Sequence, residues 1–313
     1  MDISKIITKT AFNRENQINV SDLMQLSCLK NPIVSDEFFN LVNCIKEARR
    51  NEKPVILFMG AHVIKCRLSL YVNDLIKKGW VTHVAGNGAV SIHDFELAFL
   101  GATSEDVPKS IEDGSFGMWE ETGAWMNEAI KNEANKGYGS ALAYYIDLNQ
   151  EKFPHKDCSI LYTAYINEVP ISIHVTIGAD IIHQHPKADF GAIGTSSGVD
   201  FYKICNSVSG LDGGVFLNFG SAITGPEIFL KALSKSRNLG YARKNLTTAN
   251  FDIKPLGDYK SDINTTDPNY YYRPRKNIVN RPTQGTGKGF NFELNHKESI
   301  PMLHTLLSQE CDS

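Results

Sequence analysis

The positions of apolar residues along the chain predict where helices and strands form. After Ser35, residues 36–50 (DEFFNLVNCIKEARR) carry apolar side chains three and four positions apart, which predicts an amphipathic helix capped by that serine. Residues 54–60 (PVILFMG) form a short apolar run between proline and glycine, which predicts a buried strand. The same patterns predict a helix over 64–78, ended by Gly79, and then a second strand in WVTHVAG.

The alternation of strand and helix continues along the chain. Residues 158–175 predict a helix and then a strand, and 213–240 predict a strand, a turn and a helix. A short strand is expected in LTTANFDI, and a last helix follows a glycine-rich turn. Because strand and helix alternate repeatedly, the sequence predicts an α/β fold, a Rossmann-like parallel sheet with helices on both faces. We expect an N-terminal extension, 1–34, and a single domain, 35–313.

Composition and charge narrow the function classes. The net charge is −3 and no basic patch dominates, so nothing favours binding to nucleic acid. No apolar run approaches the roughly 18 residues of a membrane span, and the first residues lack a signal-peptide pattern. The cysteines are scattered without a CxxC pair, which argues against a zinc ribbon or a disulfide framework. We therefore expect a cytoplasmic protein with neither a membrane nor a nucleic-acid partner.

Glycine marks four expected strand-to-helix turns. They span 59–65 (MGAHVIK), 85–91 (AGNGAVS), 176–186 (TIGADIIHQHP) and 218–227 (NFGSAITGPE). In parallel sheets ligands bind where strands end and helices begin, so these turns should be considered together. Glycine lets the backbone approach a phosphate, and the next helix offers free N–H groups. None of the turns matches the full GxGxxG fingerprint, and a plain tight turn is the alternative for each.

The helix expected after Gly88 carries ionisable side chains. His93 and Glu96 are three residues apart and share a face, on which they could hold a ribose, an amine or a proton. The alternative is a solvated helix face with an intrahelical pair. Ser91 and Asp94 also fit a variant of the capping box, which needs no ligand.

Two further groups of side chains are candidates for chemistry. His174, His183 and His185, the three-histidine segment, could bind a metal, form a polar active-site wall, or be ordinary surface histidines. The stretch RPTQGTGKGF holds Arg281 and Lys288 among three glycines and resembles an anion-binding nest in composition. A flexible surface loop is the alternative for this stretch, which lacks the spacing of a Walker A loop.

The chain resembles two NAD-binding families. Residues 55–96, from VILFMGAH to SIHDFE, resemble the first nucleotide-binding unit of deoxyhypusine synthase, and 159–180 and 211–228 resemble later parts of that fold. This likeness lies more in pattern than in identity. Residues 86–107 (GNGAVSIHDFELAFLGATSEDV) also resemble the NAD-dependent ornithine cyclodeaminase domain of the archaeal and cyanobacterial type. Both families imply a bound NAD that is reduced and re-oxidised within one turnover.

The resemblance implies a cofactor site and an assembly. The positions that match the family's cofactor-binding turns are Gly60, Ala61, His62, Asn87, Gly88, Ala89, Gly220, Ser221 and Ala222. Asp180 would lie near the nicotinamide or the amine. Deoxyhypusine synthase has an imine-forming lysine where this chain has Gly225, and the nearest lysine is Lys231, so we expect no modification of a translation factor. The family forms homotetramers, which implies a homo-oligomer here, a tetramer by resemblance.

These observations favour an NAD-dependent enzyme that acts at a C–N centre of a small amine or amino acid, by transient oxidation to an imine. Charge on the imine needs a nearby carboxylate, for which Asp180 and Glu96 are the candidates, with Asp94 beside them. His93 or His183 would move protons, because histidine titrates near working pH.

Three charged residues are expected to bind the substrate, and three other functions are possible. Asp94, Arg281 and Lys288 are the expected substrate-binding residues, the two cations for a carboxylate or phosphate. A sirtuin-type deacylase is one alternative, although no cysteine tetrad for its zinc is present. The others are a non-catalytic nucleotide-binding protein and a metal-dependent hydrolase that uses the three-histidine segment.

Overall fold

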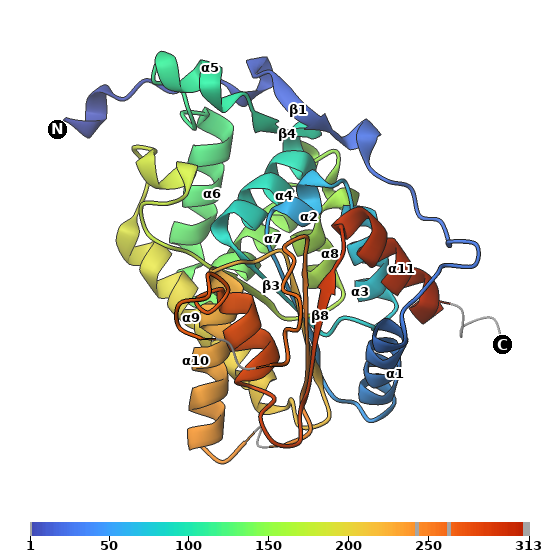
Figure 1. The fold of residues 1–313 in the computed structure, drawn as a ribbon. Helices are drawn as coiled ribbons and strands as arrows, with labels where there is room; N and C mark the ends of the chain where they lie inside the picture. Colours follow the sequence, from blue (N-terminus) through green and yellow to red (C-terminus); the bar gives the residue numbers. More distant parts are fainter. Residues whose placement is uncertain (1, 242–243, 262–263, 309–313) are drawn as a thin grey trace.

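A six-stranded sheet forms the centre of the computed structural model, which describes residues 2–241, 244–261 and 264–308 (Figure 1). Every neighbouring pair of strands in it is parallel. In spatial order the strands are β5 (Ile171–His174), β3 (His83–Asn87), β2 (Val55–Met59), β6 (Val215–Phe219), β7 (Thr247–Asp252) and β8 (Lys288–Glu293). The predicted α/β fold with a parallel sheet is therefore confirmed.

Helices cover both faces of this sheet. In β2, Val55, Leu57 and Met59 belong to one hydrophobic core and Ile56 and Phe58 to another, because successive side chains of a strand point to opposite faces. The first core is covered by α1 (Asp36–Arg50), α3 (Ser69–Lys77), α4 (Gly88–Leu100), α6 (Glu120–Asn132), α7 (Tyr138–Leu148), α8 (Ile160–Ile166) and α11 (His296–Ser308), and the second by α9 (Phe190–Ser209) and α10 (Thr224–Asn238). Among the described residues, no helix combines the length and the apolar character that crossing a bilayer requires.

Local sequence sets the ends of several elements. Ser35 Oγ accepts a hydrogen bond from the Phe38 N–H at 3.2 Å, so the predicted cap of α1 is confirmed. The single helix expected over 64–78 is wrong. The structure has α2 (His62–Lys65) and α3, which are separated at Arg67, whose φ of +68° lies in the left-handed region. Strand β8 was not predicted, because its sequence KGFNFE continues a glycine-rich turn.

The N-terminal segment packs onto the rest of the chain. Strand β1 (Asn16–Asn19) pairs antiparallel with β4 (Ala102–Glu105), a small sheet that the sequence did not predict. Ahead of β1, the Glu121 carboxylate accepts hydrogen bonds from the Thr10 hydroxyl and the Ala11 N–H. In Figure 1 this blue segment passes α5 (Val107–Glu112) and β4 before it descends to α1. Residues of the predicted extension are thus hydrogen-bonded to the domain.

The order of the strands creates a switch point between β2 and β6. The chain moves outward from β2 through β3 to β5, crosses to β6, and then moves the other way through β7 to β8. In open α/β sheets the crevice for a ligand lies at the carboxyl ends of the two strands where the order reverses. Here those two strands lead into Gly60 and Gly220.

Candidate active site

The turns after β2 and β6 lie against each other at the switch point. The Gly60 N–H donates to the Phe219 carbonyl at 2.9 Å. A Cβ on Gly60 would lie 2.7 Å from the Gly220 carbonyl oxygen, and Gly220 itself has a φ of +68°. Both positions therefore require glycine for packing inside the protein, and the structure brings these two predicted cofactor-binding turns together.

Buried polar atoms flank the Gly220 turn without partners. Asn218 Oδ1, near the end of β6, and His296 Nδ1, at the start of α11, have no hydrogen-bond partner among the described residues. The ring of His296 lies 5.9 Å from that of His62, centroid to centroid. Burial, and after it the neighbouring His62, lowers the pKa of His296 to about 4, so its ring is neutral near pH 7. Unpaired buried polar atoms are costly, which fits a site for a polar ligand.

A cleft of about 190 Å³ opens beside the first turns of α4. The predicted site residues that line it are Ala89, His93, Glu96 and Asp180. Further charged or polar residues that line it, none of them selected from the sequence, are Arg14, Lys65, Ser104 and Glu105. The structure thus brings the turns 85–91 and 176–186 together on one cavity.

A hydrogen-bond chain orients His93. The Thr103 hydroxyl donates to Glu96 Oε2 at 2.6 Å, and its oxygen lies 2.7 Å from His93 Nδ1. Because the single hydroxyl proton goes to the carboxylate, Nδ1 of His93 is the donor to Thr103, and the proton of the neutral ring is on Nδ1. Nε2 then carries the lone pair, and it has no partner in the described part of the chain. Burial lowers the pKa of His93 to about 4, which keeps the ring neutral.

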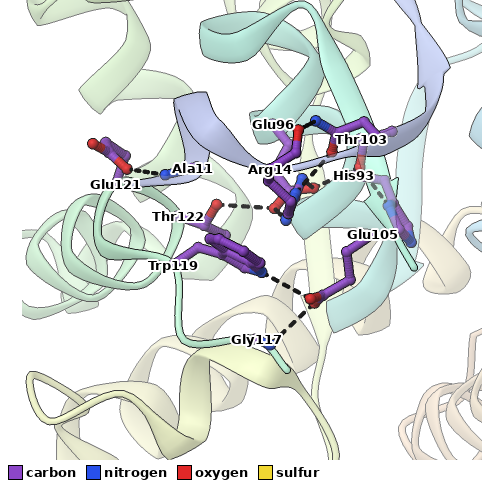
Figure 2. A network of polar contacts seen from close by, with 11 residues as sticks. Ala11, Arg14, His93, Glu96, Thr103, Glu105, Gly117, Trp119, Glu121 and Thr122 are labelled. Atoms are coloured by element: carbon purple, nitrogen blue, oxygen red, sulfur yellow. Dashed lines mark hydrogen bonds and ion pairs between the residues drawn. The ribbon is translucent and has the colours of Figure 1, made fainter. Parts of the chain in front are cut away.

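Glu96 is held from the N-terminal segment (Figure 2). The Arg14 guanidinium donates to both carboxylate oxygens, at 2.7 and 2.8 Å, and the Thr122 hydroxyl donates to Oε1 at 2.9 Å. Burial alone would raise the pKa of Glu96, but Arg14 and Thr103 hold it below its ordinary value. With both oxygens engaged, Glu96 orients Thr103 and His93, and its carboxylate is not free for a ligand.

Asp180 presents a carboxylate oxygen without a donor. Oδ2 is buried and unpartnered within the described residues, and it lies 3.9 Å from His183 Nε2, which is also unpartnered. His183 Nδ1 accepts from the N–H groups of Gly178 and Asp180 at 3.1 and 3.2 Å, so Nε2 of the neutral ring carries the proton. The carboxylate packs directly on Gly88, the first residue of α4, where any Cβ would collide with it. Burial raises the pKa of Asp180 to about 6.

The backbone beside the cleft is strained at Ser104. Its φ is +70°, a region that few residues other than glycine adopt. Its neighbour Glu105 accepts from the Trp119 indole N–H at 2.9 Å and from the Gly117 N–H at 3.0 Å (Figure 2). Strand β4 therefore supplies three consecutive residues to this region, and strain of this kind clusters at functional sites.

Weak signals in the sequence accompany some of the cleft residues that were not predicted. Thr103, Ser104 and Glu105 lie inside the run 86–107 that resembles the cyclodeaminase domain, so that likeness could have indicated them. Lys65 ends the turn MGAHVIK and could have been selected with it. Arg14 has no local signal, because its partner is 82 positions away in the sequence.

Asp94 lies outside the cleft, contrary to its expected contact with substrate. Its buried carboxylate accepts from the Ser159 hydroxyl at 2.5 Å and from the N–H groups of Ile160 and Leu161 at 2.7 and 3.1 Å. These groups form the first turn of α8, so the carboxylate stabilises that helix end. Adjacent residues of a helix point about 100° apart, which is why His93 faces the cleft and Asp94 the interior.

Arg281 and Lys288 lie near the end of the sheet at which the strands begin, opposite the end that carries the candidate site. Lys288 is the first residue of β8 and pairs with Thr247, the first residue of β7, so it lies at the amino ends of the strands. Arg281 directly follows the π-helical segment Pro274–Asn280 and donates to Asn277 Oδ1 at 3.2 Å. The candidate site lies at the carboxyl ends, so the structure does not bring this predicted anion clamp to it.

The three-histidine segment does not converge. His174 contacts the Ser172 hydroxyl at 3.1 Å and stacks on Phe58, while His183 lies beside Asp180. His185 Nε2 lies 3.4 Å from a Glu120 oxygen instead. Within the described residues, no group of three or more His, Cys, Asp or Glu side chains could hold a metal ion. The segment therefore offers no ligand set for the hydrolase alternative.

Comparisons with known proteins place the fold. No family model and no curated protein sequence matches this chain. Among solved structures, AgrE in ternary complex with ornithine and NAD+ matches with a TM-score of 0.53 and 12% identity, over 90% of this chain and 34% of AgrE. A conserved protein from Methanococcus maripaludis S2 that carries the LOR/SDH designation matches at 0.51 and 13%, over 91% of this chain and 74% of that protein.

A third match has the same character. ArgZ, an arginine dihydrolase from the ornithine–ammonia cycle in cyanobacteria, matches with a TM-score of 0.50 and 14% identity, over 88% of this chain. The chain spans about a third of the length of AgrE and ArgZ, 34% and 33%. At these identities the matches show a shared fold, so the predicted resemblance is confirmed at that level. A protein from Entamoeba histolytica designated a deoxyhypusine synthase matches with a lower TM-score of 0.45 and 10% identity, over 86% of this chain.

Proposed function

We propose that this protein is an NAD-dependent enzyme that acts at a C–N centre of a small amine or amino acid. The observation that carries the proposal is the cleft at the first turns of α4, which His93 and Asp180 both line, with Asp180 Oδ2 buried there without a partner among the described residues. A ring nitrogen that can accept a proton and a carboxylate that can offset positive charge both suit the oxidation of an amine to an imine. AgrE, which shares the fold, is known in complex with ornithine and NAD+, and this supports the cofactor and the substrate class.

The residues that would hold NAD are those of the predicted turns. They are 60–62 and 220–222 at the switch point, and 87–89 at the start of α4, a helix of 13 residues whose N-terminus favours an anion. The unpaired Asn218 Oδ1 and His296 Nδ1 fit a polar group there. When bound, NAD would accept a hydride from the carbon that carries the nitrogen. The cleft of about 190 Å³ would take the small substrate, and the turns would take the dinucleotide.

His93 would take the proton from the substrate nitrogen. His93 lines the cleft, and because the Thr103 oxygen accepts from Nδ1, the lone pair of the neutral ring is on Nε2. The ring gains a positive charge when Nε2 takes the proton, and the nearby Glu96 carboxylate stabilises that charge through Thr103. With a pKa near 4 the free ring is a weak base, so it would accept the proton only as the substrate nitrogen becomes acidic.

Asp180 would stabilise the positive charge that forms on the imine nitrogen. A preorganised carboxylate in a site that excludes water does this without reorganisation. With a pKa of about 6, Asp180 is ionised at neutral pH. His183 Nε2 lies 3.9 Å from Asp180 Oδ2, so a second polar group lies beside the carboxylate.

The proposal includes no imine between substrate and Lys231. Gly225 stands where the resembling family has its lysine, and Lys231 forms an ion pair with Glu227 on the outside of α10. The homo-oligomer implied by the resemblance remains part of the proposal, and light scattering of the purified protein would measure it.

Identification of the bound nucleotide tests this function. The purified protein would be denatured and the released nucleotide identified by mass spectrometry, alongside calorimetric titration of the native protein with NAD. We expect released NAD or saturable binding, followed by absorbance of NADH when amines or amino acids are added. Absence of both nucleotide and binding would overturn the proposal. Bound NAD with no reduction by any amine would favour the nucleotide-binding alternative.

A further inference from the structure

The Asp180 carboxylate fills the space beside Gly88 that a ligand phosphate would need. Glycine at the start of a helix lets a phosphate approach the backbone, because no Cβ stands in its way. Here a Cβ on Gly88 would lie 2.8 Å from Asp180 Oδ1 and closer still to Oδ2. Gly88 is the first residue of α4 and one of the residues that would hold NAD. The carboxylate and a phosphate of the cofactor therefore cannot lie on Gly88 at the same time.

The protein stabilises this carboxylate poorly in its position on Gly88. Asp180 Oδ2 is buried and has no hydrogen-bond partner among the described residues. His183 Nε2 lies 3.9 Å from it, too far for a hydrogen bond, and burial lowers the pKa of that ring, which favours its neutral form. A buried charge without a donor is costly, so displacement of Asp180 from Gly88 would relieve an unfavourable contact.

The loop that carries Asp180 is exposed and lightly held. Residues 176–179, which follow β5 and Val175, are exposed to solvent. Gly178 has a φ of +92°, and a Cβ there would meet no atom within 4 Å outside its chain neighbours. His183 Nδ1 accepts from the N–H groups of Gly178 and Asp180 at 3.1 and 3.2 Å, so this ring anchors the loop. Segments with exposed backbone and few packed contacts open at low cost in free energy.

These contacts together indicate a gate: we infer that the cofactor displaces Asp180 from Gly88 and that loop 176–180 moves with it, so that the carboxylate turns into the cleft. This inference rests on the proposed function and adds an order of binding to it. Because Asp180 also lines the cleft, the movement would offer its carboxylate to the substrate only after the cofactor has bound. The amine therefore binds second. The affinity for the cofactor is reduced by the fraction of molecules in which Asp180 covers Gly88.

Removal of the charge at residue 180 tests the gate. Calorimetry would compare NAD binding by the wild-type chain and by Asp180→Asn, which keeps the shape of the side chain. We expect the variant to bind NAD about tenfold more tightly, because no buried carboxylate then opposes the phosphate. ADP should gain similarly, whereas adenosine, which has no phosphate, should not. Asp189→Asn is the matched control: it removes a carboxylate that caps α9, asparagine can retain that cap, and NAD affinity should stay unchanged.

Amide exchange of the wild type tests the movement itself. When the loop leaves Gly88, the N–H groups of Gly178 and Asp180 lose their acceptor on His183. Hydrogen–deuterium exchange, measured by mass spectrometry on peptides that span 176–180, should therefore be about tenfold faster with NAD bound. A carboxylate that only repels the phosphate through space would leave this exchange unchanged, and that result would overturn the gate.

The outcomes separate the gate from the proposed function. NAD binding by the wild type with no gain in Asp180→Asn overturns the gate and leaves the proposed function standing. A gain for adenosine as large as that for NAD also overturns it, since the phosphate would not be the displaced group's competitor. Binding of NAD by Asp180→Asn but not by the wild type would support both. Binding by neither protein would contradict the proposed function and the gate with it.

Discussion

The hydroxyl of Thr103 accepts a hydrogen bond from Nδ1 of His93 at 2.7 Å. The same hydroxyl donates to Glu96 Oε2 at 2.6 Å, and Arg14 holds that carboxylate from the far side. The Arg14 guanidinium thus holds the Glu96 carboxylate, the carboxylate takes the proton of the Thr103 hydroxyl, and the hydroxyl oxygen takes the proton of His93 Nδ1 (Figure 2). The lone pair on Nε2 is the result of this sequence of contacts, and each contact can be removed separately.

Thr103→Val keeps the shape of the side chain and removes the hydroxyl. His93 Nδ1 then loses its acceptor, so we expect nitrogen NMR of the imidazole to show a mixture of tautomers. Turnover of the amine should fall by about tenfold, since only part of the ring presents its lone pair to the substrate. The free energy of unfolding should fall by about 1–3 kcal/mol, because buried polar groups lose a partner.

Thr122→Val is the matched control for that substitution. Thr122 also donates to Glu96, at 2.9 Å to Oε1, but it does not contact His93. It should cost similar stability and leave the tautomer and the turnover unchanged. Equal effects of the two substitutions on the tautomer would contradict the orienting role of Thr103.

Arg14→Met should destabilise the fold strongly. The Arg14–Glu96 pair is buried, with side chains only 3% and 2% exposed, so the variant leaves a buried carboxylate without its countercharge. Breaking such a pair costs about 3–5 kcal/mol, measured as the free energy of unfolding in denaturant. Lys9→Met is the control, because Lys9 pairs with Asp113 at 3.1 Å on the surface and should cost less than about 1 kcal/mol. A loss as small for Arg14 as for Lys9 would show that the N-terminal segment is not integral to the site.

The fold could be predicted from the sequence because its signals are local. Residues 36–50 show a helical period and residues 54–60 form an apolar run, each within one element, and the structure places α1 and β2 there. The exceptions also have local causes. Arg67 breaks the helix expected over 64–78 through a left-handed φ that its sequence does not mark, and β8 follows a glycine-rich turn that resembles a loop.

The site could be predicted only in part, because it depends on contacts between distant segments. The turns of His93 and Asp180 were identified, since glycine and ionisable residues follow their strands. The burial of Asp94 could not be predicted, because it depends on α8, 65 residues away. The edge on which Lys288 lies depends on the direction of β8, a strand that the pattern did not indicate. Arg14 could not be predicted either, because only the folded chain brings it to Glu96.

His83 should make the protein sensitive to mild acid. Its ring is buried between the Ser207 and Ser172 hydroxyls, and burial, with the charges of His174 and Lys203, lowers its pKa from 6.5 to about 3. Because the pKa of His83 is lower in the folded chain, the unfolded chain binds a proton between about pH 6.5 and pH 3 that the folded chain does not bind. Stability is therefore full above about pH 6.5 and is lost as the pH falls, by about 2 kcal/mol from this residue at about pH 5.

Denaturant unfolding at both pH values measures this loss. In His83→Gln the difference between about pH 7.5 and pH 5 should shrink by about 2 kcal/mol relative to the wild type, whatever the absolute stability. Asp94 and Asp180, whose pKa values burial raises to about 6, act in the opposite sense, and the comparison with the wild type removes their effect. An unchanged pH dependence in His83→Gln would contradict the neutral buried ring.

Asp180 should set the acid limb of the pH–activity profile. Burial raises its pKa to about 6, so the carboxylate that would stabilise the imine charge becomes protonated as the pH falls through that value. We expect kcat/KM for the amine to fall by about tenfold for each pH unit below about pH 6. Asp180→Asn should lower kcat/KM by about a hundredfold at neutral pH and flatten this limb. Retention of the acid limb in Asp180→Asn would assign the titration to another group and remove Asp180 from the proposed chemistry.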